Sequence, residues 1–400
     1  MNSRFLKLAP AIGLMLQAFV VSLILIGLDL GGVPGVDPAR GLVAGIDFNE
    51  VLFGGLLSFL LFAGALQICL ACLVAVRTHV LVLATVGVIV STLIVGFASY
   101  YLLAAAGLGV PLGYCLLFGA LISPTDPIAV LPVIRRAKAP SNLQALVEGE
   151  ALFNDGVAVV IFAVLLALVT GGGGSLPLPA EAAVLFLREA LGGLAFGLAL
   201  GYLGYRVVKT IDDYPVEILI TLALVAGGYA AAQALGISGP LAMVAAGIVI
   251  GNHGRARGMS TRTSENLDRF WEMVDIILNA VLFVLIGLEA VALVTDFSLV
   301  SLWVALAAIP IVLVARLLSV GVPLAVFSSV PGVGLRSAPF LTWVGLRGAI
   351  PIALVLSLPE GQNRDILVTM TYVVVVFSIL VQGTTVKYFV GSAQGRTGAS

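Results

Sequence analysis

Long apolar stretches recur along the whole chain, each about as long as a lipid bilayer is thick, and short polar connections separate them. A helix needs about 20 predominantly apolar residues to cross a membrane, and windows of that length predict twelve spans. These lie near residues 9–30, 51–75, 79–104, 111–134, 143–169, 182–205, 216–235, 239–251, 268–294, 298–327, 338–358 and 365–390. No connection is long enough for a soluble domain, so the pattern predicts a single all-α polytopic membrane domain over residues 1–400.

The composition excludes a soluble fold. Of the 400 residues, 60% are hydrophobic and only 10% are charged, and the mean hydropathy is +1.16. Such a chain has too little polar surface to face water. The net charge of −1 gives no sign of a nucleic-acid partner. The first span has no small-residue cleavage site after a short apolar core, so we expect it to be retained.

Lys and Arg residues are unevenly distributed between alternate connections. With a cytoplasmic N-terminus, most of the 20 Lys and Arg residues fall in cytoplasmic segments, as the retention of positive loops requires. The sequence therefore predicts that both termini are cytoplasmic. We expect a multi-pass protein of the cell membrane, of the bacterial inner or plasma membrane type, in contact with membrane lipid.

Charged residues inside the predicted spans carry the most information, because a charge in hydrocarbon is costly and normally faces a cavity or a partner. Asp126, Glu150, Asp155 and Arg347 lie near mid-span and indicate a functional site. Apart from residues toward the span ends, the remaining charges within spans are Glu148, Glu272, Asp275, Glu289 and Arg316. Glu148, Glu272 and Glu289 lie near helix ends, where a paired or snorkelling charge explains them at least as well.

Two spans contain helix-breaking residues. The fourth reads SPTDP at 123–127, where the prolines disfavour helical conformation in the residues before them and Pro127 removes a hydrogen-bond donor. The eleventh reads GLRG at 345–348, followed by Pro351. Unwound backbone at membrane depth requires burial in protein or a wet cavity. One broken helix in each half predicts an inverted repeat in which the two cross at a midplane site. Asp126 and Arg347 can compensate the dipoles of the half-helix ends.

The fifth span supplies candidate ligands in EGEALFNDGVAVVIF at 148–162. Glu150 and Asn154 share a helix face, and Asp155 turns toward an adjacent one. A carboxylate beside an amide, opposite the hydroxyl and carbonyls of a broken helix at Thr125, suits a small hard cation. Because apolar surroundings disfavour a charged carboxylate, a proton would compete for Asp155. Asn154 does not titrate, so we expect exchange of one cation for one proton.

Three cysteines do not form a disulfide framework. Cys69 and Cys72 lie in an apolar run with no second pair and no nearby histidine, which excludes a typical zinc site. We expect ordinary buried thiols at helical spacing. The sequence calls for no cofactor beyond the transported ions.

At these residues the chain strongly resembles the monovalent cation/proton antiporter family, which includes prokaryotic and animal sodium/proton exchangers. The motifs that carry the resemblance occur in family order. They are S-P-T-D-P at 123–127, E-x-x-x-N-D-G at 150–156, F-W-E-x-x-x-x-x-L-N-A at 270–280, G-L-R-G-A at 345–349 and V-Q-G-T-T at 381–385.

The resemblance implies a homodimer with a dimerisation part and a moving core. The core helices are expected mainly within 79–169 and 298–390, and the remaining helices form the scaffold. Asp155 is expected to bind the ion and the proton that replaces it. The same resemblance assigns Thr125 and Asp126 to the site lining, with Thr125 and Asp155 as sodium ligands. It also assigns Asn154 to support Asp155, and Glu150 to a structural ion pair with Arg347.

The chain departs from the family pattern in three ways. Ala151 stands where many members have a hydroxyl residue after the glutamate, so one possible cation ligand is missing. Members often have thirteen spans with an external N-terminus, whereas twelve spans and a cytoplasmic N-terminus indicate a chain that begins one helix late. The chain also ends soon after the last span, without the long tail of animal exchangers.

The function expected from these features is electroneutral sodium/proton antiport by alternating access, not enzymatic catalysis. Exchange of lithium or potassium for protons remains open, because selectivity depends on cavity size and ligand number. A channel is disfavoured by the paired broken helices and the single binding carboxylate. An intramembrane enzyme is disfavoured because no zinc-type His-Glu pair, G-x-S-x-G serine or protease-type aspartate pair is present.

Overall fold

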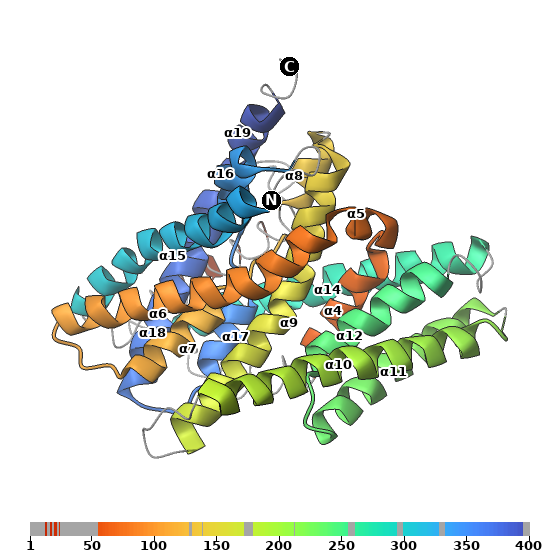
Figure 1. Cartoon of the computed structure of the whole chain (residues 1–400), viewed down its shortest axis with the longest axis horizontal. Helices are drawn as coiled ribbons and strands as arrows, with labels where there is room; N and C mark the ends of the chain where they lie inside the picture. Colours follow the sequence, from red (N-terminus) through yellow and green to blue (C-terminus); the bar gives the residue numbers. More distant parts are fainter. Residues whose placement is uncertain are drawn as a thin grey trace.

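The computed structural model shows a bundle of long helices (Figure 1). It describes residues 55–127, 130–137, 139–171, 179–211, 213–254, 261–293, 299–327 and 333–394, together with Gly13, Gln17, Val20, Val21 and Ile24. The first expected span, 9–30, therefore lies almost entirely outside the described residues, as does the beginning of the second.

The described residues form helices and connections, with no β-strand among them. The α-helices are α4 (Leu57–Gln67), α5 (Leu70–Val82), α6 (Val88–Ala105), α7 (Leu112–Ile122), α8 (Leu131–Arg136), α9 (Ser141–Gly171), α10 (Pro179–Val208), α11 (Tyr214–Ala234), α12 (Gly239–Val249), α14 (Thr261–Leu293), α15 (Leu299–Val326), α16 (Ala338–Val344), α17 (Ile350–Leu356), α18 (Gln362–Phe377) and α19 (Gly383–Gln394). In the described ranges, three π-helical segments and one 3-10 turn continue or lead into these helices at Leu83–Gly87, Ile250–Gly254, Ser378–Gln382 and Leu335–Ser337. The all-α prediction is confirmed.

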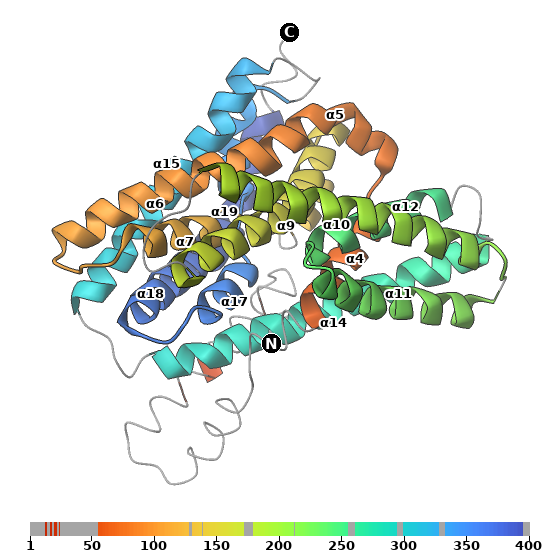
Figure 2. The ribbon, with the colours of Figure 1, turned by 60° about the horizontal axis from the view of Figure 1, so that its bottom comes forward.

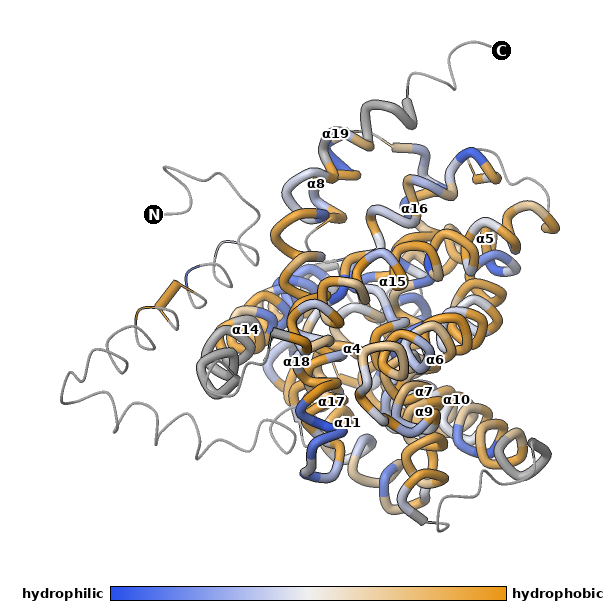
Figure 3. Tube along the Cα trace, turned by 90° about the vertical axis from the view of Figure 1, so that its left-hand side faces the viewer, coloured by the Kyte–Doolittle hydropathy of each residue, from blue (hydrophilic) through white to orange (hydrophobic). Residues whose placement is uncertain are grey.

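Within the described residues, six helical segments are individually long and apolar enough to cross a membrane. They run over 70–105, 141–170, 183–208, 214–234, 300–326 and 362–386. Shorter apolar helices and the two interrupted spans account for the rest of the described bundle, in agreement with about twelve spans. Figure 3 shows hydrophobic residues along most of the length of these helices. Their outer faces expose large apolar side chains such as Leu191 and Leu198 of α10, as a lipid-facing surface requires.

The expected boundary between the second and third spans was wrong. The chain breaks at Ile68–Cys69, where both residues are extended, and one helical segment then runs from Leu70 to Ala105. His79, the expected first residue of the third span, lies buried inside α5 with its Nε2 3.2 Å from the carbonyl oxygen of Phe327. A polar side chain with a partner does not end a helix.

The expectation for two cysteines was also wrong. Cys69 and Cys72 lie at the α4–α5 break rather than in continuous helix, and a disulfide bond joins them. Cys69 is exposed and Cys72 is half-buried. Only the third cysteine, Cys115 on α7, is a buried free thiol. The interpretation failed because it treated an unbroken apolar run as an unbroken helix.

The helices pack in two groups, visible from both directions in Figures 1 and 2. In the first group α6 packs against α7 and α15, and α15 packs against α18. In the second group α10 packs against α12, and α4 packs against α12 and α14. Helix α9 contacts both groups, since it touches α5 and α7 on one side and α10 and α12 on the other. A surface between the two groups therefore runs along α9.

Candidate ion-binding site

Two broken helices cross at the centre of the first group. The fourth span is interrupted between Ile122, the end of α7, and Leu131, the start of α8. The eleventh span is interrupted between Val344 and Ile350. The unwound segments meet where the backbone amide of Asp126 donates to the carbonyl oxygen of Leu346 at 2.8 Å. This contact is an isolated antiparallel bridge, and it confirms the predicted crossing.

Small residues allow the two unwound segments to approach so closely. A Cβ atom on Gly348 would overlap with the carboxylate of Asp126. A Cβ atom on Gly345 would lie 2.9 Å from Nε of Arg316 and 3.1 Å from Cγ2 of Thr125. The glycines of the GLRG motif therefore let the second broken helix rest directly against the first.

Arg347 binds the free end of the first half-helix. Its Nη1 donates to the carbonyl oxygens of Ser123 at 2.6 Å and Pro124 at 2.7 Å. The last carbonyls of a helix have no partners within that helix and carry partial negative charge. The side chain is 2% exposed, so the guanidinium replaces the hydrogen bonds that water would supply. Its backbone amide donates to Oγ of Ser378 at 2.8 Å, which fixes the position of the second unwound segment.

The expectation that Glu150 pairs with Arg347 was wrong, because Glu150 pairs with Arg316. Oε1 of Glu150 accepts a hydrogen bond from Nη1 of Arg316 on α15. Glu150 is 2% exposed and Arg316 is 6% exposed, so this is a buried ion pair. The guanidinium of Arg347 is instead directed to the carbonyls of the broken helix. The sequence contained two arginines inside predicted spans, and the resemblance selected the wrong one of the two.

Asn154 links α9 to the first broken helix. Its Nδ2 donates to Oγ1 of Thr125 at 2.8 Å, and its Oδ1 lies 3.5 Å from the backbone amide of Thr125. Asn154 is fully buried and Thr125 is 4% exposed. This pair of contacts sets the position of the unwound chain relative to the next residue of α9, which is Asp155.

A cavity of about 170 Å³ joins the acidic residues of the two groups. Thr125, Asp126 and Asp155 line it, whereas the buried residues Asn154 and Glu150 are not among its lining residues. The opposite wall is formed by α4 and α14, including Asp275 and Asn279. At its edge Nη2 of Arg135 pairs with Oε1 of Glu148 at 2.8 Å, and the Arg135 side chain is 59% exposed. The cavity therefore extends from this exposed pair to Asp155.

Sequence reasoning assigned no role to Asp275. Nδ2 of Asn279 donates to Oδ1 of Asp275 at 3.0 Å, and both residues face the cavity from α14. The available signal was the position of Asp275 inside the F-W-E-x-x-x-x-x-L-N-A motif. Its position opposite Asp155 could not be inferred, because α9 and α14 are far apart in sequence.

The arrangement offers oxygen ligands to a small ion. Carboxylate and hydroxyl oxygens, such as those of Asp126, Asp155 and Thr125, are groups that hard cations prefer. In the described part of the chain no group of three His, Cys, Asp or Glu side chains is placed to hold a metal ion. A carboxylate in a partly dry cavity can also exchange its proton for a cation. Crossed broken helices around such a carboxylate define a secondary transporter.

The comparisons with known proteins agree with this class. The family described as sodium/hydrogen exchanger, transmembrane, matches residues 1–391. The chain belongs to this family and is a multi-pass membrane transporter, not an enzyme. It is 46% identical over 391 residues to the Na(+)/H(+) antiporter NhaP of Pseudomonas aeruginosa, covering 96% of this chain and 91% of the relative. It is 36% identical over 376 residues to the Na(+)/H(+) antiporter NhaH of Halobacillus dabanensis, covering 92% and 90%.

A solved structure shares the fold. The sodium proton antiporter MjNhaP1 from Methanocaldococcus jannaschii superposes with a TM-score of 0.72 at 21% sequence identity. The match covers 96% of this chain and 99% of that protein. At this identity the likeness establishes the fold alone.

Proposed function

We propose that this protein exchanges sodium ions for protons across the membrane by alternating access, with Asp155 as the site that both ions share. The observation that carries the proposal is the position of Asp155 in a cavity between the two helix groups, beside the crossing of the broken helices. The two relatives described above are both named Na(+)/H(+) antiporters, which supports sodium as the cation.

The exchange step follows from the chemistry of one carboxylate. Deprotonated Asp155 binds a sodium ion, with Thr125 supplying a further oxygen and Asp126 contributing negative charge to the cavity. Protonation of Asp155 from the opposite side releases the ion. Asn154 cannot take up a second proton, so one charge crosses in each direction. Exchange is then electroneutral, and an imposed membrane potential leaves its rate unchanged.

We further propose that the first helix group is the moving core and the second is the scaffold of a homodimer. The proposed core takes in the expected ranges 79–169 and 298–390 and comprises α5 to α9 and α15 to α19. Support comes from the cavity, because α4 and α14 form one wall and the broken helices and α9 form the other. Movement of the core along that wall would carry Asp155 from one side of the membrane to the other.

The protein is proposed to lie in a bacterial plasma membrane with both termini in the cytoplasm. The support is the concentration of Lys and Arg in the segments that this topology places inside. The connection that contains Arg135 is one of these, so the cavity described here opens toward the cytoplasm.

Flux measurements test the proposal. The full chain is reconstituted in proteoliposomes with a pH-sensitive dye inside, and sodium, lithium and potassium are added in turn. We expect proton release to be greatest with sodium and to be insensitive to a potassium diffusion potential set with valinomycin. Rates that scale with voltage, or a response to potassium alone, would contradict electroneutral sodium/proton exchange.

A further inference from the structure

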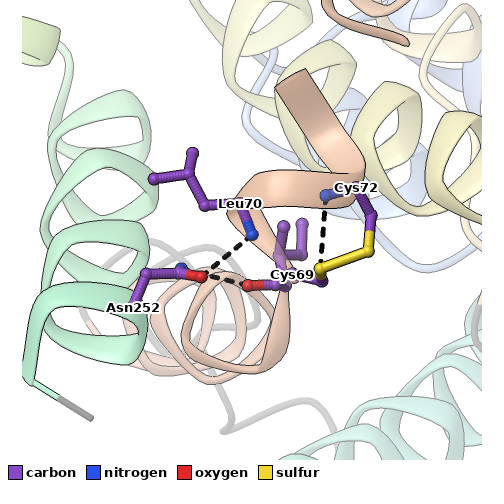
Figure 4. The surroundings of a disulfide bond; sticks show 5 residues. Cys69, Leu70, Cys72 and Asn252 are labelled. Carbon is purple, nitrogen blue, oxygen red and sulfur yellow. Dashed lines mark hydrogen bonds between the residues drawn. A yellow bond between two sulfur atoms is a disulfide. The ribbon is translucent and has the colours of Figure 1, made fainter. Parts of the chain in front are cut away.

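The break between α4 and α5 interrupts the helices at a place other than the two broken spans. It carries the cysteine pair Cys69 and Cys72, which the proposed transport cycle does not use. Ile68 and Cys69 are extended, with ψ angles of 132° and 105°. Cys69 occupies the N-cap position of α5, where its Sγ accepts a hydrogen bond from the backbone amide of Cys72 at 3.2 Å. The disulfide joins these two residues across the first turn, with their Cα atoms 5.3 Å apart (Figure 4).

A side chain from a part of the scaffold that is distant in sequence stabilises this break. Asn252, in the π-helical segment after α12, accepts a hydrogen bond from the backbone amide of Leu70 at 2.9 Å. Its Nδ2 donates to the carbonyl oxygen of Ile68 at 3.0 Å. Figure 4 shows Asn252 directed at the turn that carries the disulfide. Backbone groups that would otherwise lack partners are therefore satisfied, and the break is a built feature of the fold.

The break lies where the chain passes from one helix group to the other. Helix α4 packs against α12 and α14 in the scaffold, whereas α5 packs against α9. Gln67 and Ile68, the last residues before Cys69, line the same cavity as Asp155. If the core moves against the scaffold, as proposed above, the backbone at residues 68–72 must change direction with each cycle.

We propose that Cys69 and Cys72 form a thiol–disulfide switch that regulates the rate of transport. The disulfide fixes the first turn of α5 to the residue at the hinge, so the oxidised protein exchanges ions slowly. Reduction frees the four residues of the turn and restores movement. The inference rests on the proposed two-group motion and assigns to the cysteine pair a role separate from ion binding.

The reaction is a balanced thiol–disulfide exchange with a dithiol reductant. One thiolate of the reductant attacks Sγ of exposed Cys69, and the electron pair of the broken bond leaves on Sγ of Cys72, which takes a proton. The second thiol of the reductant then attacks the mixed disulfide, releasing Cys69 as a thiol and the reductant as a disulfide. Two electrons and two protons reach the protein, and an oxidised partner of the same class reverses the reaction.

The surroundings of Cys69 suit this chemistry. Thiolates are the attacking species, and a hydrogen bond from the first turn of a helix stabilises a thiolate. Exposure of Cys69 gives a reductant access. In the proposed topology this turn faces the cytoplasm, a reducing compartment. The pair is then a dithiol at rest and closes when the compartment becomes oxidising.

Flux measurements on the full chain test the switch. Proteoliposomes containing the wild type are treated with diamide or with dithiothreitol, and maleimide labelling with mass spectrometry reports the state of each cysteine. We expect sodium-dependent proton flux to be about fivefold slower in the oxidised protein. Dithiothreitol should restore the rate. The variants Cys69→Ser and Cys72→Ser cannot form the disulfide, so each should exchange ions at the fast rate of the dithiol form under both treatments.

Cys115→Ala is the matched control, because Cys115 is buried on α7 away from the break. This variant should respond to oxidation as the wild type does. Equal rates for the labelled oxidised and reduced forms would overturn the switch, and so would a full response in Cys69→Ser or failure of diamide to close the pair. None of these results bears on Asp155, since the wild type would still exchange ions. Exchange by an Asp155→Asn variant would instead overturn the ion site.

Discussion

Helix α9 carries two acidic residues whose surroundings differ sharply. Glu150 and Asp155 are five positions apart, which places them roughly 140° apart around the helix axis. Glu150 is buried and paired with Arg316. Asp155 faces a cavity that also contains Asp126 and Asp275, on the side where the two helix groups meet.

The two residues show two roles of a charge inside a membrane protein, one in a structural ion pair and one in ion transport. A buried carboxylate with a guanidinium partner keeps its charge, and its energetic role is to avoid an uncompensated charge in the fold. A carboxylate that faces a cavity can change its ionic partner and its protonation state. One helix therefore contributes a permanent pair to the core and a variable charge to the transport path.

Replacement of Asp155 should have the largest effect on transport. Asp155→Asn keeps the side-chain shape but removes the titrating group, so we expect sodium-dependent proton flux in proteoliposomes to be abolished. Folding, followed by gel filtration and thermal unfolding in detergent, should stay near wild type. Asp365→Asn, in the exposed first turn of α18, is the matched control and should exchange at the wild-type rate. Robust exchange by Asp155→Asn would contradict the assignment of Asp155, rather than Glu150, as the carboxylate that carries the ions.

Replacement of Glu150 should act on stability first. Glu150→Gln leaves Arg316 buried without an anion, which typically costs about 3–5 kcal/mol. We expect a lower unfolding temperature in detergent and a lower yield of folded protein. Glu148→Gln, two residues away, interrupts only the pair with exposed Arg135, and its cost should be within about 1 kcal/mol.

The double variant Glu150→Leu with Arg316→Met sharpens the same test. Apolar replacement of both partners of a buried ion pair is often tolerated, so the double variant should be more stable than Glu150→Gln alone. If Glu150→Gln unfolded at the wild-type temperature, the buried pair would not hold the fold as described.

Apparent sodium affinity should depend on pH through Asp155. In the pH range where Asp155 is protonated in the absence of cation, each decrease of one pH unit should weaken the apparent affinity about tenfold, because one proton must leave for each ion bound. The maximal rate should change less. Initial rates measured over a series of sodium concentrations at several pH values give this slope. An affinity that did not change with pH would exclude competition at one carboxylate.

Replacement of Asp275 should have the smallest effect. Asp275→Asn removes one negative charge from the scaffold wall of the cavity while the broken helices stay intact. We expect the apparent sodium affinity to fall about fivefold, equivalent to ~1 kcal/mol of lost attraction across a solvated cavity. The maximal rate should stay close to wild type. Complete loss of exchange would instead place Asp275 among the residues that bind the ion.

The sequence predicted the broken helices well because their causes are local. Pro124, Pro127 and the glycines of GLRG act within a few residues of themselves, and the crossing followed from their places in the two halves. The α4–α5 break has no such signal. No proline or glycine lies between Gln67 and Cys72, and the partner that stabilises the turn, Asn252, is more than 180 residues away in sequence.

At the site, too, the sequence could not predict contacts between charged residues that lie far apart in the chain. The sequence identified every mid-span charge, but it could not say which arginine faces Glu150. That choice depends on the packing of α15 against α9 and on the carbonyls that engage Arg347. Asp275 was visible as a charge in a span, and only the folded chain places it across a cavity from Asp155.

The most direct test of the account is the number of protons released when sodium binds. Purified protein in detergent, in weakly buffered solution at the pH where exchange is half-maximal, is mixed with sodium while a pH indicator and a calorimeter follow protons and heat. Sodium binding to the wild type should release protons, at most one per sodium bound at any pH, and the Asp155→Asn variant should release none. Sodium binding to the wild type with no proton release across the titration range, or equal release from the variant, would contradict a site shared at Asp155.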